Sequence, residues 1–133
     1  MSTIKTNTLT GTTSAGSIVV TGEGGSTTTN LQQGLAKSWI DLDGTGTIST
    51  RDSFNIGSTT DNGTGSYSPT FSNNMGSANY STPSSVANAD DAGAYNALGI
   101  VTKATTTYRI DAESSSSNND APRLDVAVLG DLA

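Results

Sequence analysis

The segment Arg123-Leu124-Asp125-Val126-Ala127-Val128-Leu129 decides the fold class of this chain. Its apolar side chains Leu124, Val126 and Val128 alternate with polar or small neighbours. A period of two places alternate side chains on opposite faces of a β-strand, so one face of this strand can cover a core while the other meets water. The segment therefore predicts a strand of an antiparallel sheet.

Further short runs of the same kind precede this strand, at residues 39–42, 47–52, 53–60, 66–72, 97–102 and 105–111. Turn residues separate them, and Asn62-Gly63 is the strongest hairpin signal. Pro69 lacks a ladder donor and predicts an edge strand or a bulge. Seven or eight short strands with almost no helical periodicity favour an all-β fold, an antiparallel β-sandwich of the jelly-roll or Ig-like type.

Composition limits the size of the core. Hydrophobic residues make up 32% of the 133 residues and charged residues 14%, and the polar remainder is mostly Ser, Thr, Asn and Gly. Threonine suits a pleated surface, and the other three supply turns. With no cysteine, disulfides are excluded, so we expect a thin core completed by contacts between subunits.

Residues 1–37 differ from the rest and predict an extended N-terminal attachment arm, followed by a β-sandwich domain at 38–133. We expect two short strands in the arm, at 3–9 and 17–21. Asn30 can cap a helix over 31–37 in which Leu31 and Leu35 share a face. We expect that short helix only where a partner surface covers both leucines.

The residues exclude several classes of function. There is no histidine and no cysteine, which removes the usual general base and thiol nucleophile. A net charge of −6 opposes nucleic acid, and no apolar run is long enough to span a membrane or form a signal peptide. Paired carboxylates can hydrolyse glycosides, but a thin sandwich seldom offers a cleft, so we expect no enzyme and no cofactor. The acidic residues closest in sequence are Asp41, Asp43, Asp52, Asp90 and Asp91.

Two features of the sequence are compatible with a binding site and also with a simpler structural interpretation. Asp41 and Asp43 precede Gly44 as in a calcium loop, but the further ligands of an EF-hand are missing. These two residues are the metal candidates, and we favour a plain β-turn. Aromatic rings stack on sugars, yet in a chain with few aromatics they more often form the core. The rings concerned are Trp39, Tyr67, Tyr80 and Tyr108, and we favour the core.

Two segments carry a resemblance to a known family: Asn30-Leu31-Gln32-Gln33-Gly34-Leu35-Ala36-Lys37-Ser38-Trp39, and Gly44-Thr45-Gly46-Thr47-Ile48-Ser49-Thr50-Arg51-Asp52-Ser53-Phe54-Asn55-Ile56 with Asp61-Asn62-Gly63-Thr64-Gly65 after it. Over residues 2–80 the chain resembles short structural proteins of marine tailed phages, labelled tail-fibre-like. The chain departs from this family at Asp41 and Asp43, where related sequences tend to have Asn, which leaves local ion binding open.

The resemblance implies a symmetric, usually trimeric β-rich virion component with an N-terminal attachment segment. Its expected partners are copies of itself and other virion proteins of the capsid or the tail, and its expected location is the virion surface. The expected subunit or virion interface residues are Ile4, Leu9, Ile18, Val20, Leu31, Leu35 and Trp39. The alternative is a carbohydrate- or receptor-binding adhesin that presents loops at 73–78, 88–96 and 114–120 to a host-surface glycan. Fold alone does not separate a fibre from a capsid decoration protein.

Overall fold

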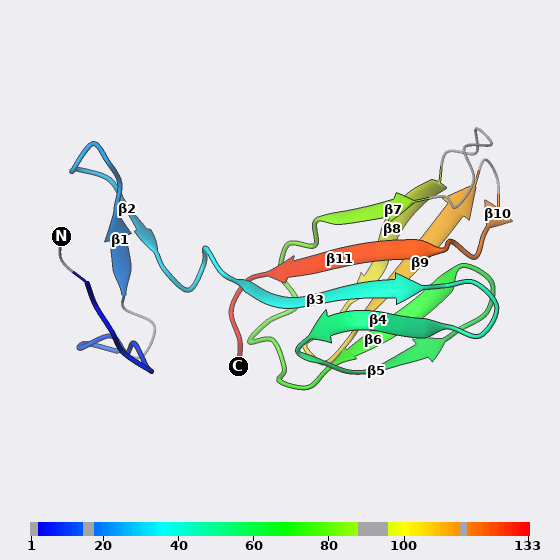
Figure 1. The fold of residues 1–133 in the computed structure, drawn as a ribbon, viewed down its shortest axis with the longest axis horizontal. Helices are drawn as coiled ribbons and strands as arrows, with labels where there is room; N and C mark the ends of the chain where they lie inside the picture. The colour runs from blue at the N-terminus through cyan, green and yellow to red at the C-terminus, as the bar shows by residue number, and fades with distance from the viewer. Residues whose placement is uncertain (1–2, 15–17, 88–95, 115–116) are drawn as a thin grey trace. The chain divides into compact units, whose positions relative to one another are not determined.

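The computed structural model describes residues 3–14, 18–87, 96–114 and 117–133 (Figure 1). The chain divides into two compact units, Met1–Leu35 and Ala36–Ala133. The division lies two residues before the one expected at 37, because Ala36 and Lys37 already belong to strand β3 (Ala36–Asp43). Every regular element in the described part of the chain is a strand.

The first unit contains one small hairpin. Strand β1 (Val19–Thr21) pairs antiparallel with β2 (Thr28–Asn30), and Val20 lies opposite Thr29. The expected strand at 3–9 is not formed, because no described segment pairs with its backbone. Residue 17 of the second expected run lies outside the described residues.

The segment after β2 is a turn, and the short helix that the sequence predicts only under a covering partner surface is not formed. The Asn30 side-chain oxygen accepts hydrogen bonds from the backbone amides of Gln32 at 2.8 Å and Gln33 at 3.4 Å. This is the cap that the sequence predicts, but β3 begins at Ala36, so no room remains for a second helical turn. A helix this short is marginal without a covering surface.

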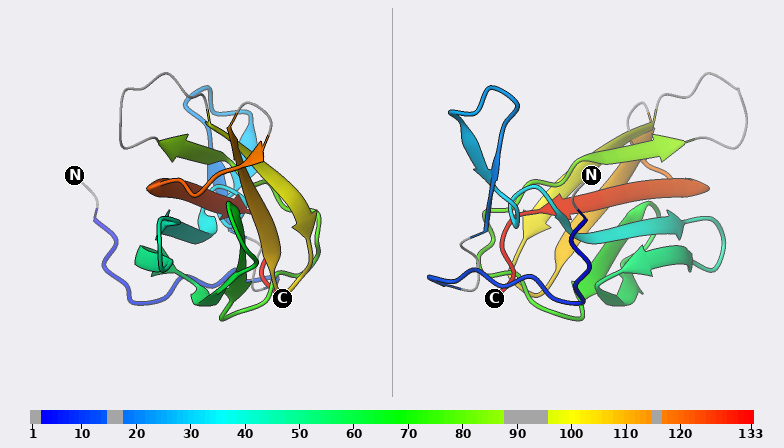
Figure 2. Two further views of the ribbon diagram at one scale, coloured as in Figure 1. Left: turned by 90° about the vertical axis from the view of Figure 1, so that its right-hand side faces the viewer. Right: turned by 60° about the vertical axis from the view of Figure 1, so that its left-hand side comes forward.

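The second unit is an antiparallel β-sandwich of two sheets that face each other (Figure 2). One sheet has the order β4-β3-β11-β7, where β4 is Ser49–Phe54, β11 is Arg123–Leu129 and β7 is Ser84–Ala87. The other has the order β10-β9-β6-β5, and β8 also pairs with β9. Its strands are β5 (Ile56–Asp61), β6 (Ser66–Phe71), β8 (Asn96–Lys103), β9 (Tyr108–Ser114) and β10 (Ser117–Asn118). The predicted fold class, an all-β sandwich, is confirmed.

The chain passes from the first sheet to the second at Asn55, between β4 and β5. Asn55 has a positive φ of 58°, a conformation that asparagine tolerates better than most residues. Its amide nitrogen donates to the carbonyl oxygens of Lys37 and Asn73, both at 3.0 Å, and its Oδ1 accepts from the Asn73 backbone amide at 2.7 Å. One side chain thus ties the crossing point to two other segments, at Lys37 and Asn73.

Strand β6 differs from the expectation for Pro69. It lies inside its sheet, between β5 and β9, and not at an edge. The regular ladder to β9 covers Ser66 and Tyr67 only, and then stops before Pro69. The missing donor is thus accommodated by a break in pairing, and Thr107 Oγ1 donates to the Pro69 carbonyl at 2.7 Å.

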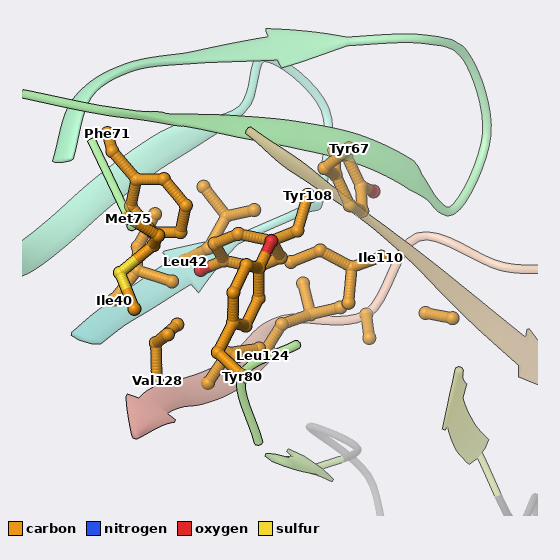
Figure 3. Close-up of a cluster of buried hydrophobic side chains, with 13 residues drawn as sticks. Ile40, Leu42, Tyr67, Phe71, Met75, Tyr80, Tyr108, Ile110, Leu124 and Val128 are labelled. Atoms are coloured by element: carbon orange, nitrogen blue, oxygen red, sulfur yellow. The ribbon is translucent and has the colours of Figure 1, made fainter. Parts of the chain in front are cut away.

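The core lies between the two sheets and is rich in aromatic rings (Figure 3). The Phe71 ring packs edge-on against Tyr80, with centroids 5.8 Å apart, and at a tilt against Tyr108 at 5.5 Å. Three of the four aromatic residues weighed for a sugar site are buried here, as the favoured interpretation predicts: Tyr67, Tyr80 and Tyr108. Thirteen side chains form the buried cluster, so the core is small. Many of these side chains are the inward-facing, alternate residues of the strands.

Two valines test this arrangement. Val128 is fully buried on β11, whereas Val101 on β8 is half exposed. We expect Val128→Ala to lower the free energy of unfolding by about 2 kcal/mol, and Val101→Ala to lower it by less than about 1 kcal/mol. Urea unfolding followed by circular dichroism measures both values. Equal losses in the two variants would contradict the assignment of the core.

Candidate binding face

The outer face of the β4-β3-β11-β7 sheet carries the side chains that alternate with the core. On β3, Ile40 and Leu42 are buried, whereas Trp39 and Asp41 point outward. Antiparallel pairing aligns these outward residues into rows across the sheet, because directly opposed residues share a face. The composition of each row therefore follows from the strand register.

The first row is apolar. Trp39 lies opposite Phe54 on β4 and opposite Ala127 on β11. Pro83 extends the row, because its carbonyl accepts a hydrogen bond from the Ala127 amide at 2.9 Å. Phe54 is 52% exposed and Trp39 is 37% exposed, which leaves two aromatic rings in contact with solvent next to each other.

The second row is acidic. Asp41 lies opposite Asp52 on β4 and opposite Asp125 on β11, and Ser85 on β7 lies opposite Asp125. The Ser85 hydroxyl donates to Asp125 at 3.5 Å. Like charges placed directly across a sheet destabilise it, so this row needs compensation.

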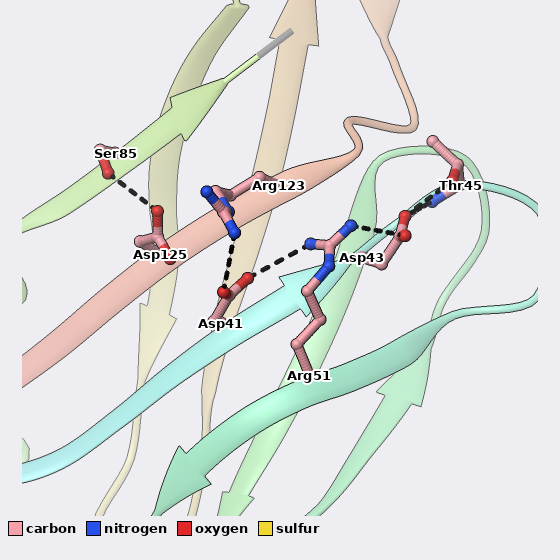
Figure 4. Close-up of polar contacts among 7 residues, drawn as sticks. All are labelled: Asp41, Asp43, Thr45, Arg51, Ser85, Arg123 and Asp125. Atoms are coloured by element: carbon pink, nitrogen blue, oxygen red, sulfur yellow. Dashed lines mark hydrogen bonds and ion pairs between the residues drawn. The ribbon is translucent and has the colours of Figure 1, made fainter. Parts of the chain in front are cut away.

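Two arginines supply that compensation for Asp41 and Asp43 (Figure 4). Arg51 contacts Asp41 at 3.2 Å and Asp43 at 2.6 Å, and Arg123 contacts Asp41 at 3.4 Å. Two guanidinium groups thus balance these two carboxylates. Asp52 and Asp125 form no ion pair with any described residue, so the face keeps an excess of negative charge.

The hypothesis of an ion at Asp41 and Asp43 gains no support from this geometry. Both carboxylates face arginine side chains, which would repel a cation. Within the described ranges, no group of three or more potential ligands is placed to hold a metal ion. The favoured β-turn interpretation fits the contacts at Asp43, whose Oδ1 accepts from the Thr45 amide at 3.0 Å and hydroxyl at 2.6 Å.

The turn after β3 is held by a contact with the core residue Tyr67. The Tyr67 hydroxyl lies 3.0 Å from the Gly44 carbonyl oxygen and 2.8 Å from Asp120 Oδ1. A Cβ at position 44 would collide with that hydroxyl, so this turn requires glycine. Burial is the main cause that raises the pKa of Tyr67 well above its usual value, and the hydrogen bond to Asp120 raises this pKa further. The neutral hydroxyl therefore remains a donor at any ordinary pH.

A groove of about 500 Å³ runs along this face where the two rows meet β7. It is lined by Trp39, Ile40, Asp41, Pro83, Ser84, Ser85, Asp125, Val126 and Ala127. Most of its wall is apolar, and the polar side chains that the strand register places on this face of the groove are Asp41, Asp125 and Ser85. Because all of them stand on paired strands or directly beside one, the groove is preorganised.

The structure places the residues expected at an interface in both units. Trp39 stands in the groove, and the other six lie in the first unit, exposed or half-buried: Ile4, Leu9, Ile18, Val20, Leu31 and Leu35. The sugar-site alternative brought Trp39 together with three tyrosines, but its actual neighbours are Phe54, Asp41 and Ala127. Asp90 and Asp91, and parts of the loops proposed at 88–96 and 114–120, lie outside the described residues.

The sequence analysis assigns none of four members of this face to a site: Phe54, Pro83, Ser85 and Asp125. The alternation of β11 indicates that Asp125 points outward, but nothing local indicates which strand lies beside it. A search for outward positions on the predicted strands would have found Phe54 and Asp125, whereas Pro83 and Ser85 lie on none of those strands.

Comparisons with protein-family models, with curated proteins and with solved structures find no match. Among the described residues, no helix has the length and hydropathy needed to cross a membrane.

The Asp43 carboxyl gives a prediction on the electrostatics of this face. Hydrogen bonds from the Thr45 hydroxyl and amide, assisted by Arg51, lower the pKa of Asp43 below its ordinary value of 3.8. A lowered pKa stabilises the fold above the unfolded-state pKa, and this contribution is lost as the pH falls through the folded-state pKa. We expect Thr45→Ala to raise the Asp43 pKa toward 3.8 without reaching it, because the backbone amide remains a donor.

Carboxyl ¹³C NMR titration measures this pKa directly. Thr47→Ala is the matched control, because Thr47 is exposed and is not among the groups that lower the pKa of Asp43, and it should leave the value unchanged. An identical Asp43 pKa in the wild type and in Thr45→Ala would contradict the assigned cause.

Proposed function

We propose that this protein is a non-catalytic structural subunit of a bacteriophage particle. In this proposal it is a symmetric, trimeric β-sandwich fibre or decoration protein that attaches through its N-terminal arm. The observation that carries the proposal is the exposure of apolar side chains in the first unit. Ile4 is 85% exposed and Leu9 is 59% exposed, and the described residues of this unit form only two strands of three residues each.

Such an arm is incomplete by itself. Burying one Ile or Leu side chain contributes about 1.5–3 kcal/mol, so the arm gains stability when a partner covers it. Residues 3–9 also have the composition of a strand but no partner strand among the described residues. Pairing with another chain would satisfy both their backbone groups and their apolar side chains.

The sandwich supports a passive role. Its core is closed by its own two sheets, and on its outer face Arg51 and Arg123 form ion pairs with Asp41 and Asp43. The chain has no histidine and no cysteine to act as base or nucleophile. The resemblance of residues 30–39, 44–56 and 61–65 to tail-fibre-like proteins supplies the setting, a phage particle, for this combination of arm and sandwich.

Charged substitutions in the arm test the proposal. We expect the wild-type protein to form a defined oligomer at micromolar concentration, and we expect Ile4→Asp together with Leu9→Asp to shift it to a monomer, because two buried apolar contacts are replaced by desolvated charges. Size-exclusion chromatography with light scattering measures the mass. Circular dichroism should show the same β-sheet signal in both proteins.

Thr6→Asp together with Thr8→Asp is the matched control. It adds the same charge to the same segment but removes no large apolar side chain, so the oligomer should persist. A folded wild-type monomer, or an oligomer that tolerates both double variants equally, would contradict the proposed role of the arm.

A further inference from the structure

We propose that the groove on the outer face of the β4-β3-β11-β7 sheet binds a neutral hexopyranose unit of an oligosaccharide. This goes beyond the structural role proposed above and does not depend on it. The argument uses the apolar row, the acidic row and the groove in which they meet.

The apolar row supplies a stacking platform. A pyranose ring has a flat face of C–H groups, and an exposed aromatic ring is the usual surface for it. Trp39 is held in place by its pairing with Phe54 and Ala127 and keeps 37% of its surface exposed. The rigid sheet therefore presents one indole to solvent at a fixed position beside Pro83.

The acidic row supplies hydroxyl acceptors next to that platform. Asp125 lines the groove and forms no ion pair with a described residue; its contact with Ser85 is long, at 3.5 Å. Asp41 also lines the groove, and Arg51 and Arg123 hold its carboxylate in place. Sugar hydroxyls that donate to such carboxylates form charge-assisted hydrogen bonds.

The same charges limit the kind of ligand. Excess carboxylates would repel phosphate groups and acidic sugars, whereas a neutral sugar combines an apolar face with hydroxyl donors. The groove volume of about 500 Å³ is within the usual range for small-molecule sites. It suits one or two sugar rings.

Trp39 is itself the probe, because it is the single tryptophan of the chain. The experiment titrates the full-length protein with the methyl glycosides of glucose, galactose, mannose and N-acetylglucosamine, and follows tryptophan emission. A glycan array probed with the same protein extends the search to oligosaccharides. We expect a saturable emission change with at least one neutral glycoside and a matching array signal.

Two variants locate the site. Asp125→Asn should weaken binding about tenfold, as expected when a charged acceptor is replaced by a neutral one. Ala127→Arg should abolish the titration by filling the groove while leaving Trp39 in place. Glu113→Gln, on the other sheet and exposed, is the control and should bind as the wild type does. Thermal unfolding confirms that each variant is folded.

Several outcomes would overturn the proposal. These are no saturable change and no array signal for any neutral glycan, binding confined to acidic glycans, or undiminished binding by a folded Ala127→Arg variant. A tryptophan emission that shifts with protein concentration alone would instead identify the face as a contact between copies of this chain, which also overturns it.

Discussion

The register between β3 and β11 is the constraint on which the rest of the sandwich depends. It sets Leu42 opposite Leu124 and Ile40 opposite Val126 inside the core, and Asp41 opposite Asp125 outside. Because side chains alternate with a period of two, a slip of one residue would exchange the two faces. The core and the candidate binding face are therefore two consequences of one alignment, and a change that disturbs one would disturb the other.

Local alternation predicted much of the sandwich from the sequence. The inward set on β11 and the hairpin at Asn62-Gly63 depend on neighbouring residues alone, so they were found. The binding face depends on which strands lie side by side, and Arg123 reaches Asp41 from the far end of the chain. No local pattern encodes that pairing. The prediction of a strand at 3–9 was wrong for a related reason, because such a strand requires a partner strand that the described chain does not supply.

The two units differ in how much of their backbone is paired and in how far their apolar side chains are buried. The sandwich pairs its strands within two sheets and buries four aromatic rings in its core, those of Tyr67, Phe71, Tyr80 and Tyr108. It leaves an outer face on which Arg51 and Arg123 balance part of the negative charge. The first unit does neither, because it keeps apolar side chains exposed and pairs little of its backbone. In the function proposed above, the first unit attaches to a partner and the sandwich presents a surface.

Hydrogen–deuterium exchange, measured on the protein below and above its assembly concentration, tests this division most directly. The account predicts that the amides of β3 and β11 exchange slowly at both concentrations, whereas those of residues 3–14 and 18–30 become protected only upon assembly. Strong protection of these arm amides in the monomer, or exchange in them that stays fast at every concentration, would contradict the claim that the arm is completed by a partner chain.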